Sequence, residues 1–221
     1  MTRGERAKAL VTVLPRIYPA AHCELDFKTP LQLLIATILS AQCTDKRVNL
    51  VTPALFQRYR SAAAFAAAPP AELEQAIQST GFFRNKTKSI RAAAAAIEER
   101  HGGKVPQTMD ELHALPGVGR KTANVVLGNA FNKNEGVVVD THVARLSQRL
   151  GLTTQQDPEK IERELMRLIP RKDWTNWSHW LIAHGRYRCF ARKPDCPHCE
   201  LLHLCPSGPK FIRAGEARAL A

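Results

Sequence analysis

The chain has 221 residues, 44% of them hydrophobic, which is enough for one large domain or two small ones with a buried core. Lysine and arginine number 32 against 20 aspartate and glutamate residues, so the formal net charge is +12, which favours a polyanionic partner. A basic housekeeping enzyme or a ribosome-associated protein would carry a similar charge, so charge alone does not choose between these classes. No apolar run reaches the ~18 residues that span a bilayer, and residues 1–6 do not lead into a secretory core, so we expect a cytoplasmic protein with no membrane partner.

The N-terminal part of the chain predicts helices joined by short turns. Residues 5–14 have a helical pattern, and Thr29 can cap a second helix that Pro30 begins. Its apolar residues recur at helical spacing: Leu31, Leu34, Ile35, Ile38 and Leu39. This helix is predicted to end near residue 40, and Asp45 can cap the next one. Gln42 therefore lies in a turn between two helices.

A second turn follows the helix that begins at Pro70. Gly81 is expected to end that helix, and it leaves Phe82 and Phe83 side by side. Consecutive positions on a helix face different ways, so one of the two aromatic rings should be exposed. The turn is also basic, with Arg84, Lys86 and Lys88. The helix after it is predicted to end near Gly102.

The stretch from Leu115 to Ala123 predicts a tight hairpin between two helices. Upstream, Thr108 and Glu111 fit a capping box that starts a short helix. Gly117 and Gly119 allow positive φ angles, and free N–H groups at the start of the following helix attract phosphate. A plain helix connector is an equally open interpretation of these nine residues, since glycine and proline are common in turns.

The C-terminal part adds three more helices and one short extended run. Residues 136–139 are the only β-branched run, and helices are expected after residues 140, 157 and 173. Three tryptophans in the last of these are expected in the core: Trp174, Trp177 and Trp180. The whole chain thus predicts about ten helices and no sheet, which defines an all-α protein.

Four of the six cysteines crowd together near the C-terminus: Cys189, Cys196, Cys199 and Cys205. Six, two and five residues separate them, a compact spacing that predicts a metal centre. Zinc and a 4Fe–4S iron–sulfur cluster both accept four thiolates, and the two-residue gap suits zinc. The remaining cysteines, Cys23 and Cys43, are expected to be small buried residues.

Two residues could carry chemistry. Lys121 lies in the first turn of a helix beside Arg120, where the helix dipole and the like charge should favour its neutral, nucleophilic amine. A solvated lysine that contacts phosphate is the alternative. Asp140 precedes a helix and is expected to cap it through the amide of His142 or Val143.

Three segments together closely resemble the endonuclease III family, bifunctional DNA glycosylase/AP lyases of the helix-hairpin-helix superfamily. They are the hairpin at 115–123, the segment Val137–His142 and the four-cysteine array, within a similarity from about Leu31 to Cys205. The resemblance implies a two-lobed fold with a cleft. One lobe would be a helical bundle, residues 23–133, ending in the helix-hairpin-helix motif at about 108–131. The other would join residues 1–22 to 134–221 and carry an iron–sulfur cluster loop.

The resemblance also implies a function: base-excision repair that removes oxidised pyrimidines from duplex DNA through a lysine Schiff base. Lys121 would attack C1′ and Asp140 would assist. The hairpin would grip the DNA backbone through Leu115, Gly117, Gly119 and Arg120. Gln42 and Phe82 would enter the duplex where the base leaves it, although the family often has leucine in place of Phe82.

The cysteine spacing matches the cluster loop of this family, so the resemblance favours the 4Fe–4S cluster over zinc. The cluster would be structural and would present Arg192 and Lys193, which lie between the first two ligands, to phosphates. The protein is expected to act as a monomer on damaged or abasic DNA of the nucleoid.

Two other functions compete with this one. A monofunctional adenine or mismatch-thymine glycosylase would activate water, but Lys121 and the lack of a long C-terminal domain speak against it. A DNA-binding or redox-sensing protein without catalysis would need neither Lys121 nor Asp140, so their joint presence favours an enzyme.

Overall fold

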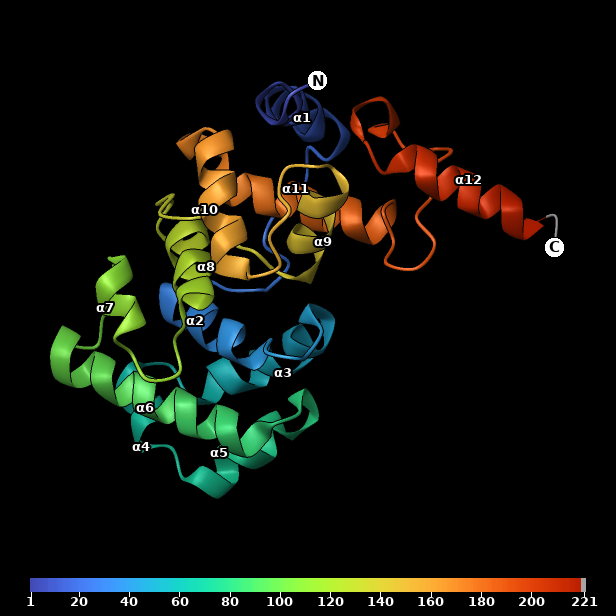
Figure 1. Cartoon of the computed structure of the whole chain (residues 1–221). Coiled ribbons are helices and arrows are strands. Elements are labelled where there is room, and N and C mark those ends of the chain that lie inside the picture. The colour runs from blue at the N-terminus through green and yellow to red at the C-terminus, as the bar shows by residue number, and fades with distance from the viewer. Residues whose placement is uncertain (220–221) are drawn as a thin grey trace. The chain divides into compact units, whose positions relative to one another are not determined.

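The computed structural model describes residues 1–219, and within that range the chain is helical without any β-strand (Figure 1). The all-α prediction is therefore confirmed. The described α-helices are α1 (Arg3–Ile17), α2 (Pro30–Leu39), α3 (Asp45–Arg58), α4 (Ala62–Ala67), α5 (Pro70–Ile77), α6 (Phe83–His101), α7 (Met109–His113), α8 (Arg120–Ala130), α9 (Thr141–Arg149), α10 (Pro158–Leu168), α11 (Trp174–Tyr187) and α12 (Gly208–Ala219). Short 3-10 helices are η1 (Gln78–Thr80), η2 (Arg171–Asp173) and η3 (Leu202–Leu204).

The chain divides into two compact units, each with its own hydrophobic core. One unit is Cys23–Glu135, and the other combines Met1–His22 with the described residues from Gly136 onward. Neither core draws on residues of the other unit. Among the described residues, no helix combines the length and the apolar character that crossing a bilayer requires.

Helix α2 is the centre of the Cys23–Glu135 unit. Six of its ten residues are buried, and it packs against α3, α6 and α8. Thr29 caps it and Pro30 begins it, as the sequence predicts. The alanine-rich part of α6 lies against α4, because small side chains let two helices approach closely (Figure 1). The buried alanines there are Ala93, Ala94 and Ala96.

The other unit packs α1 against α10 and α11, and α9 against α11. Its helix α11 carries the three tryptophans, whose exposed fractions are 9% or less, so their expected place in the core is confirmed. Trp177 is fully buried and belongs to the same apolar cluster as Leu10 and Leu14 of α1. This core holds the start of α9 and the end of α11 in place. Polar residues of the candidate site extend from these two helix ends.

Three local predictions need correction. Thr44, not Asp45, caps α3, because the Thr44 hydroxyl accepts the Arg47 amide and Asp45 is already the first helical residue. Helix α4 was not expected, since its alanine run has no apolar periodicity, but Ser61 caps it and Phe65 anchors it in the core. Helix α12 also lies outside the ten expected helices.

Candidate functional site

The hairpin between α7 and α8 forms as the sequence predicts. Thr108 caps α7 by accepting the Glu111 amide at 3.4 Å, while its hydroxyl donates to the Glu111 carboxylate at 2.6 Å. The expected capping box is thus formed in part, with the hydroxyl in place of the Thr108 amide as the donor to Glu111. The Val118 amide then closes the turn on the Leu115 carbonyl at 3.1 Å.

The two glycines of the hairpin have different conformations. Gly117 has φ +76°, and an added Cβ would lie 2.6 Å from the Cβ of Ser89 on α6, so only glycine fits there. Gly119 is extended, with φ −84°, and a Cβ on it would face open space. Of the two glycines that allow positive φ, only Gly117 adopts it. Leu115 is 2% exposed, so its side chain belongs to the core.

Helix α8 begins directly after this turn. Gly119 is its N-cap and offers no side chain to the first-turn amides. Amides in the first turn have no acceptor within their own helix, so the start of α8 presents N–H donors and the positive end of the helix dipole. Lys121 is exposed in this first turn, next to the half-buried Arg120.

Asp140 begins α9 in the other unit. Its Oδ1 accepts the Val143 amide at 2.8 Å, so the predicted cap is confirmed with Val143 as the partner. The capping bond uses one carboxylate oxygen, and the side chain is only half-buried. The preceding run of valines, Val137 to Val139, is buried but forms no strand in the described chain.

Gln42 and Phe82 each stand at the tip of a turn in the Cys23–Glu135 unit. Both have positive φ, +53° for Gln42 and +48° for Phe82, which is uncommon for residues other than glycine and asparagine. Both side chains are exposed, and Phe82 is 61% exposed. Phe83 packs against the core instead, so the prediction that one of the two rings is exposed is confirmed.

The four C-terminal cysteines line one small pocket of about 20 Å³. None of them forms a disulfide. Much of the remaining lining is apolar: Leu146, Leu150, Leu201, Leu202 and Phe211. Across the described residues, no three cysteine, histidine or acidic side chains converge closely enough to hold a single metal ion. Burial raises the pKa of Cys196, and it raises the pKa of Cys199 to about 11.

Arg149 of α9 holds one end of this cysteine loop. Its guanidinium donates to the Cys189 sulfur at 3.3 Å and to the carbonyls of Phe190 and Ala191, each at 2.7 Å. The Arg149 carbonyl also lies 3.5 Å from the Cys205 sulfur. Sequence analysis missed this residue. Its only sequence signal is its position at the C-terminal end of a helix, which does not reveal a contact with a distant loop.

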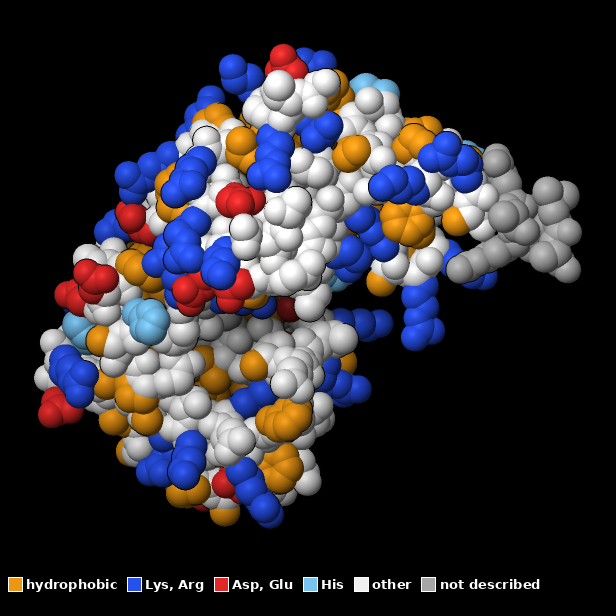
Figure 2. Space-filling view, in the orientation of Figure 1, with side chains coloured by type: hydrophobic (Ala, Val, Ile, Leu, Met, Phe, Trp, Pro, Cys, Tyr) orange, Lys and Arg blue, Asp and Glu red, His pale blue; other side chains and the backbone are white. Residues whose placement is uncertain are grey.

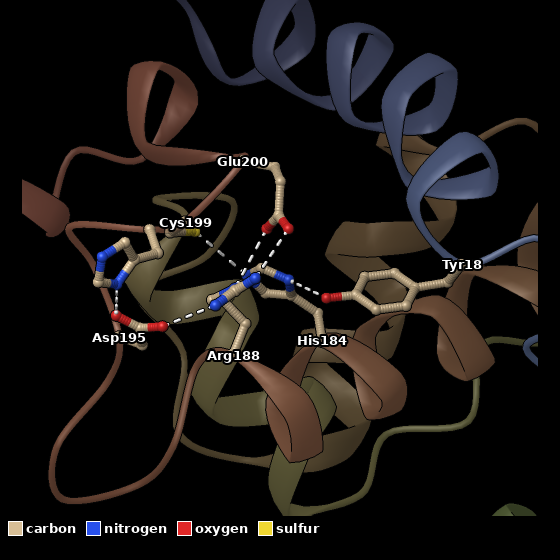
Figure 3. Close-up of polar contacts among 7 residues, drawn as sticks. Tyr18, His184, Arg188, Asp195, Cys199 and Glu200 are labelled. Atoms are coloured by element: carbon tan, nitrogen blue, oxygen red, sulfur yellow. Dashed lines mark hydrogen bonds and ion pairs between the residues drawn. The ribbon is translucent and has the colours of Figure 1, made fainter.

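Arg188 holds the other end of the loop (Figure 3). It donates to Asp195 at 2.6 Å and pairs in a two-pronged manner with Glu200 at 3.0 and 3.3 Å. These two carboxylates flank Cys196 and Cys199 in sequence, so one guanidinium fixes both sides of the central cysteine pair. The hydrogen bonds to Glu200 and Asp195 raise the pKa of Arg188, which keeps it charged.

His184 connects this loop to α1 (Figure 3). Its Nδ1 lies 2.8 Å from the Tyr18 hydroxyl, and its Nε2 lies 3.6 Å from the Cys199 sulfur. Burial lowers the pKa of His184 to about 4, so the ring is neutral at pH 7. Sequence analysis did not identify His184 or Tyr18 as part of the site.

Arg192 and Lys193 are exposed on the loop between Cys189 and Cys196. Many other lysine and arginine side chains cover the face drawn in Figure 2. The backbone on either side of Arg192 and Lys193 is held by two arginines, since Arg149 donates to the Phe190 and Ala191 carbonyls and Arg188 donates to the Asp195 side chain.

Comparison with known proteins agrees with this arrangement. Residues 35–171 match the model of the HhH-GPD superfamily base excision DNA repair proteins, which spans the hairpin and Asp140. Endonuclease III of Synechocystis sp. is 60% identical over 206 residues, 93% of this chain and 94% of that protein. Endonuclease III of Bacillus subtilis is 48% identical and covers 90% of this chain and 91% of its own.

Solved structures agree as well. A non-covalent endonuclease III–DNA complex superposes with a TM-score of 0.91 at 45% identity, covering 96% of this chain and 99% of its own. The fold and the hairpin thus define a base excision repair DNA glycosylase. Within that class, the chain belongs to the endonuclease III family.

Proposed function

We propose that the protein is a bifunctional glycosylase and AP lyase that removes oxidised pyrimidines from duplex DNA through a Schiff base on Lys121. The observation that carries the proposal is the exposed Lys121 in the first turn of α8, directly behind the Gly117 turn. First-turn amides would hold a DNA phosphate there, which would bring the sugar of the damaged nucleotide to the lysine. A solved structure of a trapped covalent endonuclease III–DNA intermediate has 45% sequence identity to this chain.

The proposed reaction begins with attack of the unprotonated Lys121 amine on C1′. The C1′–N bond breaks as the C1′–Nζ bond forms, and the base leaves with a proton. Opening of the sugar ring gives the Schiff base. Removal of a 2′ hydrogen then expels the 3′ phosphate by β-elimination, and water releases the amine. The strand is cut without an oxidant or a metal-dependent step.

Asp140 is assigned a supporting role in this reaction. Its carboxylate would stabilise positive charge on the sugar while the base departs and would accept or return protons. The cap fixes Oδ1 on the Val143 amide, so the second oxygen remains for this work.

The remaining contacts to DNA follow from exposure and backbone geometry. We assign Gln42 and Phe82 to the space left by the extruded base, since both stand exposed at the tips of left-handed turns. Gly117, Gly119 and Arg120 would contact the backbone at the hairpin, and Leu115 would support that turn from the core. The protein would act as a monomer on duplex DNA of the nucleoid.

The cysteine pocket fits a 4Fe–4S cluster held by Cys189, Cys196, Cys199 and Cys205. Four thiols that line one pocket can bind either a zinc ion or a 4Fe–4S cluster. The cysteine spacing, which resembles the cluster loop of the endonuclease III family, favours the cluster. The Arg149 guanidinium on the Cys189 sulfur also suits an anionic sulfur cluster. When bound, the cluster would supply structural cross-linking, and the loop would present Arg192 and Lys193 to phosphates.

Product analysis tests this proposal. A duplex with one oxidised thymine is incubated with the native protein or with Lys121→Gln, and the strands are separated with and without alkali. We expect the native protein to release the base and cut the strand without alkali. Lys121→Gln should do neither. A cut that appears only after alkali would indicate a monofunctional glycosylase, and no base release from any oxidised pyrimidine would overturn the proposed substrate.

A further inference from the structure

Lys86 is a buried lysine whose charge lacks an acidic partner among the described residues. It lies in α6 with 4% of its surface exposed. Its ammonium donates to the carbonyl of Leu39 at 2.7 Å and to the carbonyl of Thr80 at 2.8 Å. Burial lowers the pKa of Lys86 because removal from water disfavours the charged ammonium. A buried charge of this kind costs free energy when the protein folds. A methionine could fill the same volume without that cost.

The two carbonyls belong to the two turns that carry the exposed tip residues. Leu39 is the last residue of α2, three residues before Gln42. Thr80 is the last residue of η1, two residues before Phe82. Lys86 is also tied to Phe82 through its own backbone, because the Lys86 amide donates to the Phe82 carbonyl at 3.0 Å. One side chain therefore links both turns.

Each turn also has a backbone hydrogen bond of its own, from the Cys43 amide to the Ser40 carbonyl at 3.1 Å and from the Gly81 amide to the Gln78 carbonyl at 3.2 Å, but neither of these bonds links the two turns. Gln42 and Phe82 both adopt left-handed backbone conformations, which a chain keeps only when its surroundings hold it there. The carbonyl at the end of α2 has no acceptor role within its own helix, and a cation near a helix C-terminus is favourable. The ammonium satisfies this carbonyl and Thr80 together, and thereby sets the distance between the two turns.

We propose that Lys86 is a positioning residue for base extrusion: it fixes the turns of Gln42 and Phe82 relative to each other so that both side chains enter the duplex together. This inference rests on the proposed roles of Gln42 and Phe82. Lys86 itself touches neither DNA nor the reacting sugar. Its removal should impair steps that require unstacking and spare steps that do not.

The test uses the full-length protein with two substrates. One is a duplex with an oxidised thymine and 2-aminopurine beside it, whose fluorescence rises when the base unstacks. The other is a single-stranded oligonucleotide with an abasic site, where no stack must be opened. Lys86→Met removes the ammonium and keeps the stem. Lys88→Met, an exposed lysine on the same helix, is the matched control.

We expect Lys86→Met to slow fluorescence change and duplex excision by about tenfold or more, as loss of charged hydrogen bonds implies. Cleavage of the single strand should stay within about twofold of native, and Lys88→Met should match the native protein on both substrates. Lys86→Arg should recover part of the duplex rate. In a Gln42→Ala/Phe82→Ala background, Lys86→Met should have no further effect on extrusion, since coupled residues are not additive.

Equal losses on both substrates, or an additive effect in the double-alanine background, would mean that Lys86 serves only the stability of the unit. If Lys86→Met does not fold, Lys86→Gln replaces it, with the same expected separation of the two substrates. If the proposed glycosylase and lyase function is wrong, the native protein will cleave neither substrate. If Gln42 and Phe82 do not enter the duplex, the Gln42→Ala/Phe82→Ala variant will keep the native fluorescence response.

Discussion

Gly117 packs against Ser89 of α6 so closely that an added Cβ would lie 2.6 Å from the serine Cβ and 2.7 Å from its hydroxyl oxygen. Gly117 also has φ +76°. Two independent constraints thus require glycine at the position that turns α7 into α8.

Gly117→Ala should therefore lower the free energy of unfolding by about 1–3 kcal/mol and weaken duplex binding, because the turn must shift away from α6. Gly119→Ala is the matched control for stability alone, since its extended backbone accepts alanine and a Cβ there meets open space. Urea unfolding and DNA titration measure both effects. Equal stability of the two variants would show that the turn tolerates displacement.

Substitutions of Asp140 separate its cap from its proposed chemistry. Asp140→Asn keeps a side-chain acceptor for the Val143 amide, whereas Asp140→Ala loses it and about 1 kcal/mol of stability. Both variants should lose at least about a hundredfold in single-turnover base release, because neither retains the carboxylate. Thermal melts and quenched time courses provide the two measurements. A fully active Asp140→Asn would restrict this residue to capping.

Arg149 should control how tightly the loop keeps its metal centre. Arg149→Gln loses the donors to the Cys189 sulfur and to two loop carbonyls. We expect the absorbance near ~400 nm to decay roughly tenfold faster in chelator, since partners of metal ligands commonly contribute that much. Arg163→Gln, an exposed arginine of α10 in the same unit, serves as control. A purified protein that contains zinc without iron would contradict the cluster itself.

Arg192 and Lys193 should contribute to DNA binding through phosphate contacts. Removal of both charges should reduce the salt dependence of duplex affinity by about 1.8 in the slope of log K against log salt, if each contacts one phosphate. Lys160→Ala/Arg163→Ala removes two exposed charges from α10 in the same unit and should leave that slope nearly unchanged. Identical slopes for the two double variants would show a general charge effect.

The sequence predicted a helix correctly where apolar residues recur at helical spacing and a capping residue stands at the start of that pattern. Thr29 with Pro30 and Asp140 with Val143 illustrate this agreement. Helix α4 escaped prediction because six residues of mostly alanine carry propensity without periodicity. The sequence does not distinguish Asp45 from Thr44 as the cap of α3, because both residue types cap helices and only the folded backbone shows where the helix begins.

Sequence motifs were sufficient to name the residues proposed to contact DNA or metal. They did not reveal the residues that hold the cysteine loop and the exposed turns in position. Arg149, Arg188 and His184 reach the cysteine loop through tertiary contacts that no local pattern encodes. Lys86 was grouped with the basic turn beside Phe82. One signal was present, since Lys86 precedes the buried Ile90 by four residues and so lies on the apolar face of α6.

Lys121 should form a covalent bond with the sugar, and borohydride trapping detects that bond directly. The protein is mixed with a duplex that contains an abasic site in the presence of borohydride, which reduces a Schiff base to a stable link. The cross-linked protein is then digested, and mass spectrometry locates the modified residue. We predict a single nucleotide adduct on Lys121 and no cross-link with Lys121→Gln. An adduct on a different amine, or a cross-link that persists in Lys121→Gln, would contradict the account.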